Sequence, residues 1–124
     1  NPHLVAAVGL NKTPSDKGQQ AKIQVDKDQN SSSLSQWIEQ SSNGAIGTAI
    51  ILPDANGYSE DNLNHLILKP VVSGQKMTYY AGAIWDRWGD VKSQTAWLDY
   101  LNKMAARYRD PVNVSLSSIN NQKP

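Results

Sequence analysis

The chain has 124 residues, no cysteine and a formal net charge of +1 at pH 7. This length suffices for one modest domain with a hydrophobic core, and the missing cysteine excludes disulfides and thiolate chemistry. The charge is balanced and forms no basic block, which excludes the electrostatic signature of a nucleic-acid binder. Because its apolar runs are shorter than the roughly 18 residues of a membrane span, we expect neither nucleic acid nor membrane as a partner.

The first half of the chain has the pattern of strands separated by polar turn formers. Residues 3–10 (HLVAAVGL) form a short apolar run, and residues 21–26 (AKIQVD) alternate between apolar and polar side chains, as a half-buried strand does. Residues 34–40 (LSQWIEQ) give a weaker strand signal that ends at an Asn-Gly turn. Residues 45–53 (AIGTAIILP) have the pattern of a buried strand, and residues 54–62 (DANGYSEDN) are expected to form a polar loop.

Two further strands are predicted before the pattern changes. Residues 65–72 (HLILKPVV) and 77–85 (MTYYAGAIW) are rich in β-branched and aromatic side chains, which favour strands. The four residues between them, SGQK, have the length of a hairpin connection. We therefore expect these two segments to pair as a hairpin.

From about residue 94 to 109 the hydrophobic period is that of a helix. The apolar stripe that would cover a sheet consists of Trp97, Leu101, Met104, Ala105 and Tyr108. Ser93 is a plausible N-cap, since its hydroxyl can accept a hydrogen bond from an amide of the first turn. Asp110-Pro111 is expected to stop the helix, residues 112–116 to add a last strand, and residues 117–124 to form a polar tail.

This order of elements predicts a mainly β architecture: an antiparallel β-sandwich with one C-terminal amphipathic helix packed on a sheet. Strands do not alternate with helices, so a doubly wound α/β fold is excluded. We expect residues 1–124 to form either a single domain or the C-terminal portion of a larger β-sandwich.

Three patterns in the second half resemble a known family. A Tyr-Tyr-x-Gly-x-x-Trp strand is matched by Tyr79, Tyr80, Gly82 and Trp85. A helix of pattern Trp-x-x-Tyr-Leu-x-x-x-Ala is matched by Trp97, Tyr100, Leu101 and Ala105, and the proline stop before a final strand by Asp110 and Pro111. This combination resembles the C-terminal end of uncharacterised secreted or periplasmic proteins of Bacteroidetes-type polysaccharide-utilisation systems, with a galactose-mutarotase-like β-sandwich.

The resemblance implies a periplasmic or secreted protein that acts on carbohydrate. Because family members are longer, it also implies that the N-terminal portion of the same protein, or a partner chain, completes the sandwich. Mutarotase-like folds employ a histidine and a carboxylate around the sugar ring, so His65 becomes the catalytic candidate, ahead of His3. Its partner carboxylate could be Glu39, Glu60 or Asp61, and spacing selects none of them. Alternatively, His65 is a structural histidine.

The stretch after the paired tyrosines has the composition of a sugar site. In a strand over 77–85, Tyr79 and Trp85 share one face with two alanines between them, and sugars combine apolar C–H faces with polar rims. Arg87 could hold a uronate carboxylate with its planar fork of donors. The candidate substrate-binding residues are Tyr79, Trp85, Asp86, Arg87, Trp88 and Asp90. Alternatively, Tyr79 and Trp85 pack the sheet against the helix, and the charges only solvate the turn.

No metal or cofactor is expected. The two histidines and the scattered carboxylates match no zinc spacing, and the phosphate- and dinucleotide-binding motifs are missing. The sequence favours a carbohydrate-active protein that binds acidic oligosaccharides and, if it processes them, acts as a glycoside hydrolase or polysaccharide lyase. The alternatives are a non-catalytic carbohydrate-binding module and a structural β domain that pairs with a partner chain.

Overall fold

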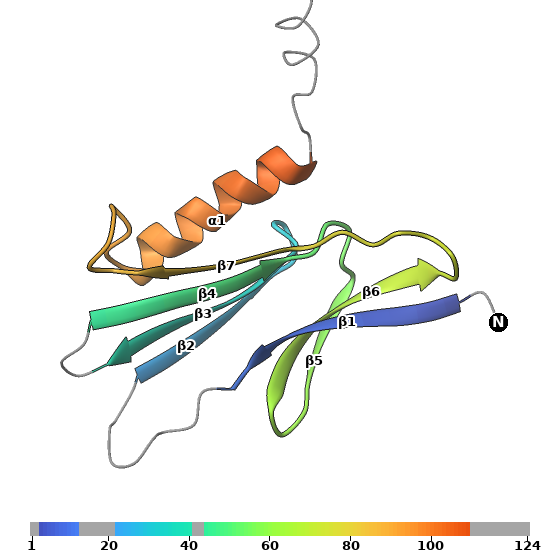
Figure 1. Cartoon of the computed structure of the whole chain (residues 1–124), viewed down its shortest axis with the longest axis horizontal. Coiled ribbons are helices and arrows are strands. Elements are labelled where there is room, and N and C mark those ends of the chain that lie inside the picture. Colours follow the sequence, from blue (N-terminus) through green and yellow to red (C-terminus); the bar gives the residue numbers. More distant parts are fainter. Residues whose placement is uncertain (1–2, 13–21, 41–43, 110–124) are drawn as a thin grey trace, which may run out of the picture.

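The computed structural model describes residues 3–12, 22–40 and 44–109. Within these ranges the strands form two antiparallel sheets, of order β1-β6-β5 and β2-β3-β4-β7. The predicted mainly β fold with one C-terminal helix on a sheet is confirmed (Figure 1). The elements are β1 (His3–Asn11), β2 (Lys22–Asp28), β3 (Ser33–Gln40), β4 (Gly44–Ile51), β5 (Gly57–Glu60), β6 (Asn64–Val72), β7 (Tyr80–Trp85) and α1 (Gln94–Arg109).

The connection between β6 and β7 differs from the prediction. The predicted hairpin between them is wrong, because β6 pairs with β1 and β5 while β7 pairs with β4. The residues between them cross from one sheet to the other, and Met77 packs against the core between the sheets. The segment expected to be a polar loop contains β5, which pairs with β6. Asp110-Pro111, the last strand predicted at 112–116 and the tail at 117–124 lie outside the described residues.

Helix α1 covers one face of the four-stranded sheet (Figure 1). The buried core between helix and sheet consists of Trp37, Ala45, Ala49, Ile51, Trp97, Leu101 and Ala105. At the end of the helix, Tyr108 stacks on Tyr80 of β7, with ring centroids 3.5 Å apart and an interplanar angle of 5°. Among the described residues, no helix is long and apolar enough to cross a membrane.

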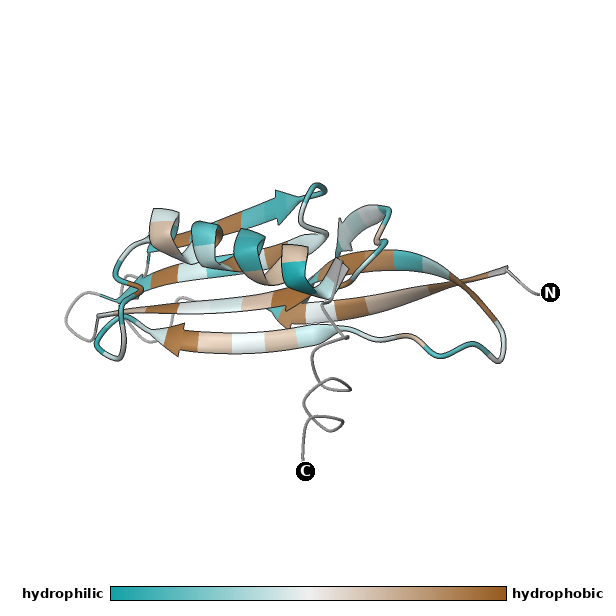
Figure 2. Cartoon of the chain, turned by 90° about the horizontal axis from the view of Figure 1, so that it is seen from above, coloured by the Kyte–Doolittle hydropathy of each residue, from teal (hydrophilic) through white to brown (hydrophobic). Residues whose placement is uncertain are grey.

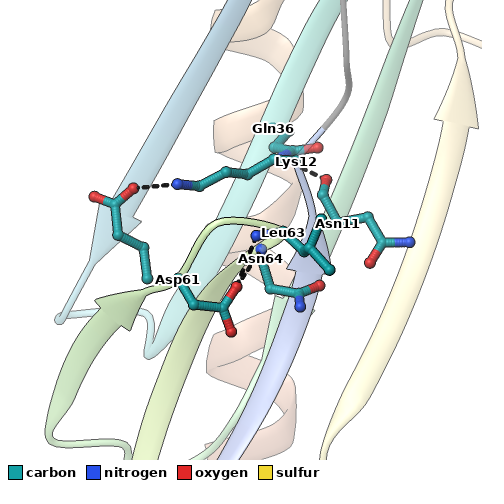
Figure 3. Close-up of polar contacts among 7 residues, drawn as sticks. Asn11, Lys12, Gln36, Asp61, Leu63 and Asn64 are labelled. Atoms are coloured by element: carbon teal, nitrogen blue, oxygen red, sulfur yellow. Dashed lines mark hydrogen bonds and ion pairs between the residues drawn. The ribbon is translucent and has the colours of Figure 1, made fainter.

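A second core lies on the opposite face of the four-stranded sheet, against the three-stranded sheet. It consists of Leu34, Ile50, Leu52 and Ile67. Hydrogen bonds also join the sheets: the Tyr58 hydroxyl donates to the Ser33 carbonyl (2.8 Å), and the Gln36 amide donates to the Asn11 carbonyl (3.1 Å; Figure 3). Because β3 and β4 lie between the helix and the three-stranded sheet, they are buried on both faces. The segments that follow the ends of these two strands are therefore held in place.

Candidate functional site

The stretch of tryptophans and charged residues at 85–90 begins at the last residue of β7, at one end of the four-stranded sheet. The register of β7 with β4 pairs Tyr80 with Ile51 and Trp85 with Ile46. Side chains alternate along a strand, and Tyr80 packs against the helix core. Trp85 therefore lies on the face opposite the helix rather than beneath it, and 38% of its surface is exposed.

The turn after Trp85 is held against β4 and the start of the helix. The Asp86 amide donates to the Ala45 carbonyl (2.9 Å), and the Trp88 amide donates to the Trp85 carbonyl (2.9 Å). The Lys92 ammonium donates to the Asp86 carbonyl at 2.7 Å. Trp88 is thus fixed at its backbone, while 74% of its surface is exposed. An ordered backbone with an exposed indole is a suitable platform for a flat apolar ligand face.

Arg87 lies beside the first indole of this stretch. Its guanidinium carbon is 5.7 Å from the centroid of the Trp85 ring, within the range of a cation–π contact. Asp90 follows in the same exposed turn, after Gly89, whose φ of +77° favours glycine. The structure thus gathers four predicted residues at one corner, Trp85, Asp86, Arg87 and Trp88, and places a fifth, Asp90, in the same turn.

Two hollows adjoin this corner and share Gln40 in their linings. An apolar hollow of about 440 Å³ is formed where Ile46 of β4 meets Ala83, Ile84 and Trp85 of β7. A polar hollow of about 320 Å³ lies between the β3–β4 end and the start of the helix. The polar one is lined by Trp37, Glu39, Gln40, Gly44, Ala45, Asp86, Lys92, Ser93 and Gln94.

The carboxylate of Asp86 is the most distinctive polar group in the polar hollow. Its Oδ1 is buried and has no hydrogen-bond partner within the described part of the chain. A side chain at Gly44 would collide with this oxygen, so glycine is needed there for packing as well as for its φ of +80°. A buried acceptor without a donor is costly, and a ligand hydroxyl in the hollow would supply that donor.

His65 lies in the other sheet. It belongs to β6, where the register sets it opposite Leu10 and Glu60. Its Nδ1 is buried and lacks a hydrogen-bond partner within the described residues. The structure therefore brings the catalytic candidate close to one predicted carboxylate, Glu60, but not to the corner that ends β7.

The other predicted site residues lie in different parts of the structure. Tyr79 directly precedes β7, so about 20 Å of extended chain separate it from Trp85 at the far end. Glu39 lines the polar hollow together with Asp86. Glu60 lies opposite His65, Asp61 lies in the β5–β6 turn, and His3 belongs to β1, in the same sheet. Of the carboxylates that spacing left open, only Glu39 reaches the corner.

Hydrogen bonds from Lys12 and from two backbone amides hold the carboxylates of Glu60 and Asp61 (Figure 3). Lys12 donates to Glu60 at 2.6 Å, and this bond, followed by the charge of the ammonium, lowers the pKa of Glu60. Asp61 accepts the backbone amides of Leu63 (2.8 Å) and Asn64 (2.7 Å), which lower its pKa. Both carboxylates therefore have hydrogen-bond partners that stabilise the β5–β6 hairpin.

Sequence reasoning missed three polar residues of the polar hollow, Gln40, Lys92 and Gln94. Lys92 and Gln94 flank the N-cap residue Ser93, and the only sign of them in the sequence is this position at the start of a helix. Gln94 also donates to Asp26 of β2 at 2.7 Å. Within the described ranges, no three His, Asp or Glu side chains gather in a way that could hold a metal ion.

The fold and this corner define a class: a mainly β protein with a helix-covered sheet and an exposed aromatic turn at the end of its last described strand. The family model described as "Domain of unknown function (DUF4861)" matches residues 1–114, and the chain belongs to this family. Neither the curated proteins nor the solved structures compared with the chain gave a match.

Proposed function

We propose that the chain binds an acidic oligosaccharide at the corner formed by Trp85, Asp86, Arg87 and Trp88. One observation carries this proposal: the exposed indoles of Trp85, at the end of β7, and of Trp88, on the turn that follows, lie beside a guanidinium and two hollows. Hollows of about 320 and 440 Å³ fall within the range of small-molecule sites, roughly 300–1,000 Å³. Sugar rings stack by their C–H faces on such indoles.

The charges at the corner favour a ligand that carries carboxylates. Arg87 presents a planar fork that suits a uronate, and Lys92 adds a second cation in the adjoining hollow. Asp86 and Glu39 supply acceptors for sugar hydroxyls there. A neutral oligosaccharide would use the indoles and acceptors but would form no ionic contact with Arg87 or Lys92, so we expect weaker binding.

Binding without chemistry is the version that the geometry supports best. His65 lies in the other sheet, so a ligand on the Trp85–Trp88 corner does not need it. The hydrolase or lyase version is a separate proposal, in which His65 and Glu60, released from Lys12, would act on a ligand bound at the three-stranded sheet. Both versions extend the resemblance to galactose-mutarotase-like proteins of polysaccharide utilisation, and with it a periplasmic or secreted location.

Titration with oligogalacturonate tests the proposal, with tryptophan fluorescence and melting temperature as readouts. We expect the wild type to melt at a higher temperature with the ligand, and Trp88→Ala to abolish this rise. Because Trp88 is largely exposed, the free variant should melt where the wild type does. Leu63→Ala, at a similarly exposed apolar residue of the β5–β6 turn, is the matched control.

The acidic specificity has its own test. Arg87→Gln should weaken oligogalacturonate binding much more than binding of the neutral galactose oligomer. Trp88→Ala should weaken both. If Trp88→Ala binds normally, or if it unfolds the protein, the corner is not the site. For the catalytic version, His65→Ala would have to abolish product formation while leaving affinity intact.

A further inference from the structure

Among the described strands, β7 forms one edge of the four-stranded sheet, and nothing in its sequence protects that edge. Its residues, YAGAIW, include no charge and no proline, and an uncharged edge is a template for pairing with another strand. The opposite edge of the same sheet, β2, has the sequence KIQVDKD, in which four of seven residues are charged. Figure 2 shows the contrast, with β7 apolar or neutral along its length and β2 hydrophilic toward its end.

The hydrogen bonds between β4 and β7 determine the directions in which the backbone amides of β7 point. The Asp86 amide donates to the Ala45 carbonyl, which continues the β4–β7 register by one residue. Backbone groups of an antiparallel strand alternate between its two neighbours. Gly82 and Ile84 therefore direct their amides toward β4, and Ala81 and Ala83 direct theirs toward the edge that no described strand covers.

We infer that this edge pairs with β7 of a second copy of the chain, antiparallel, around a two-fold axis at Ala83. In that register Ala81 lies opposite Trp85 of the second copy, and Gly82 lies opposite Ile84 of the second copy. Trp85 and Ile84 thus each face a small residue, one pair on each face of the joined sheet, while Tyr80 lies opposite Asp86 of the second copy. An axis at Gly82 would instead set Ile84 opposite Tyr80, large against large.

Pairing would also cover apolar surface that is now exposed. Ala81, Ala83 and Trp85 are exposed on the face opposite the helix, and Ala83 and Trp85 line the apolar hollow. The second copy would cover the open side of this hollow and part of Trp85, so pairing of β7 and binding of the proposed ligand would compete there. Because β7 has six residues, the contact is smaller than a standard interface, and we expect a concentration-dependent dimer. The dimer does not require the proposed ligand.

Sedimentation equilibrium of the 124-residue chain over a concentration series tests the inference. The apparent mass should approach twice 13.6 kDa as concentration rises. Ala83→Pro should remain monomeric, because proline removes an amide that points to the open edge while the ladder to β4 stays intact. Circular dichroism and melting show whether this variant is folded.

A charge exchange at the axis gives a second test that does not depend on proline. Two Ala83→Lys chains would place like charges directly opposite each other, as would two Ala83→Glu chains, so each variant alone should be monomeric. An equimolar mixture should dimerise, because the charges then attract. Val5→Lys on β1, the other uncharged edge strand, is the control, since Val5 is 68% exposed; it should dimerise normally.

Three results would overturn the inference. One is a wild-type chain that stays monomeric at every concentration. Another is a dimer that survives both Ala83→Pro and Ala83→Lys, which would place the contact elsewhere. The third is loss of the dimer in Val5→Lys, which would assign the contact to β1.

Discussion

Trp97 and Gly47 show how closely single residues are matched between helix and sheet. Trp97 is 1% exposed, and its indole lies directly over β4. A Cβ at Gly47 would be 2.7 Å from Cε2 and 2.9 Å from Nε1 of this ring. Such distances are shorter than real side-chain contacts, so any larger residue at this position must displace the indole.

Gly47→Ala is therefore expected to destabilise the protein by about 1–2 kcal/mol, because overpacking costs about 1–3 kcal/mol and the stiffer unfolded chain returns part of it. Gly82→Ala is the matched control on the neighbouring strand and the same sheet face, where a Cβ meets no atom within 4 Å. It should be neutral or stabilising by up to about 1 kcal/mol. Urea unfolding measures both, and equal effects would contradict this packing.

The residues of the candidate site were only partly predictable from the sequence. Strand alternation predicted that Trp85 shares a face with two alanines, and the register confirms which residues share that face. Strand alternation did not reveal that Lys92 and Glu39, which are far apart in the sequence, line the same hollow. That proximity depends on where β3 ends relative to the helix start, which no local pattern encodes.

Helix α1 is the element that the sequence specified best. Its apolar period and its N-cap were both readable, and the Ser93 hydroxyl accepts the Ala96 amide at 3.1 Å as predicted. Local rules suffice here because capping and amphipathic spacing act within a few residues. The strand β5 and the connection from β6 to β7 depend instead on distant partners, such as Ser33, which binds the Tyr58 hydroxyl. Spacing alone could not predict them.

Ser93→Ala tests the cap. Loss of the side-chain acceptor should destabilise the protein by about 1 kcal/mol. Ser93→Asp should keep the native stability or raise it, because it retains an acceptor and adds a negative charge to a first turn that has no acidic residue. The urea midpoint followed at 222 nm measures both variants, and an Asp variant as unstable as the Ala variant would contradict the cap.

At the scale of the whole molecule, the described chain has three layers: helix α1, the four-stranded sheet in the middle, and the three-stranded sheet. Strand β3 is buried along most of its length, including the polar residues Ser33, Ser35 and Gln36. Its alternating faces contribute Trp37 to the helix side and Leu34 to the sheet side. The sequence predicted a weak strand here because a strand buried on both faces lacks the usual alternation. The second core packs the three-stranded sheet against β3 and β4.

At low pH, we expect the contact between the three-stranded sheet and the rest of the chain to weaken first at the β5–β6 hairpin. Lys12, Glu60 and Asp61 hold it, and the pKa values of both carboxyl groups are lowered in the folded protein. Groups with lowered pKa stabilise the fold fully above their unfolded values, about 4.3 for Glu and 3.9 for Asp, and this contribution is lost as the pH falls through the folded values. The urea midpoint should therefore fall over this window.

The double variant Glu60→Gln/Asp61→Asn separates these two groups from general acid effects. It should be less stable than the wild type at neutral pH, because the charge-assisted bonds to Lys12 and to the backbone amides are weakened. Its urea midpoint should also change less between about pH 6 and pH 2, since two groups that bind protons more readily in the unfolded state are gone. Asp90→Asn, in the exposed β7–α1 turn, controls for the loss of a negative charge. If the double variant follows the wild-type pH curve, these carboxylates do not link the hairpin to the stability of the whole chain.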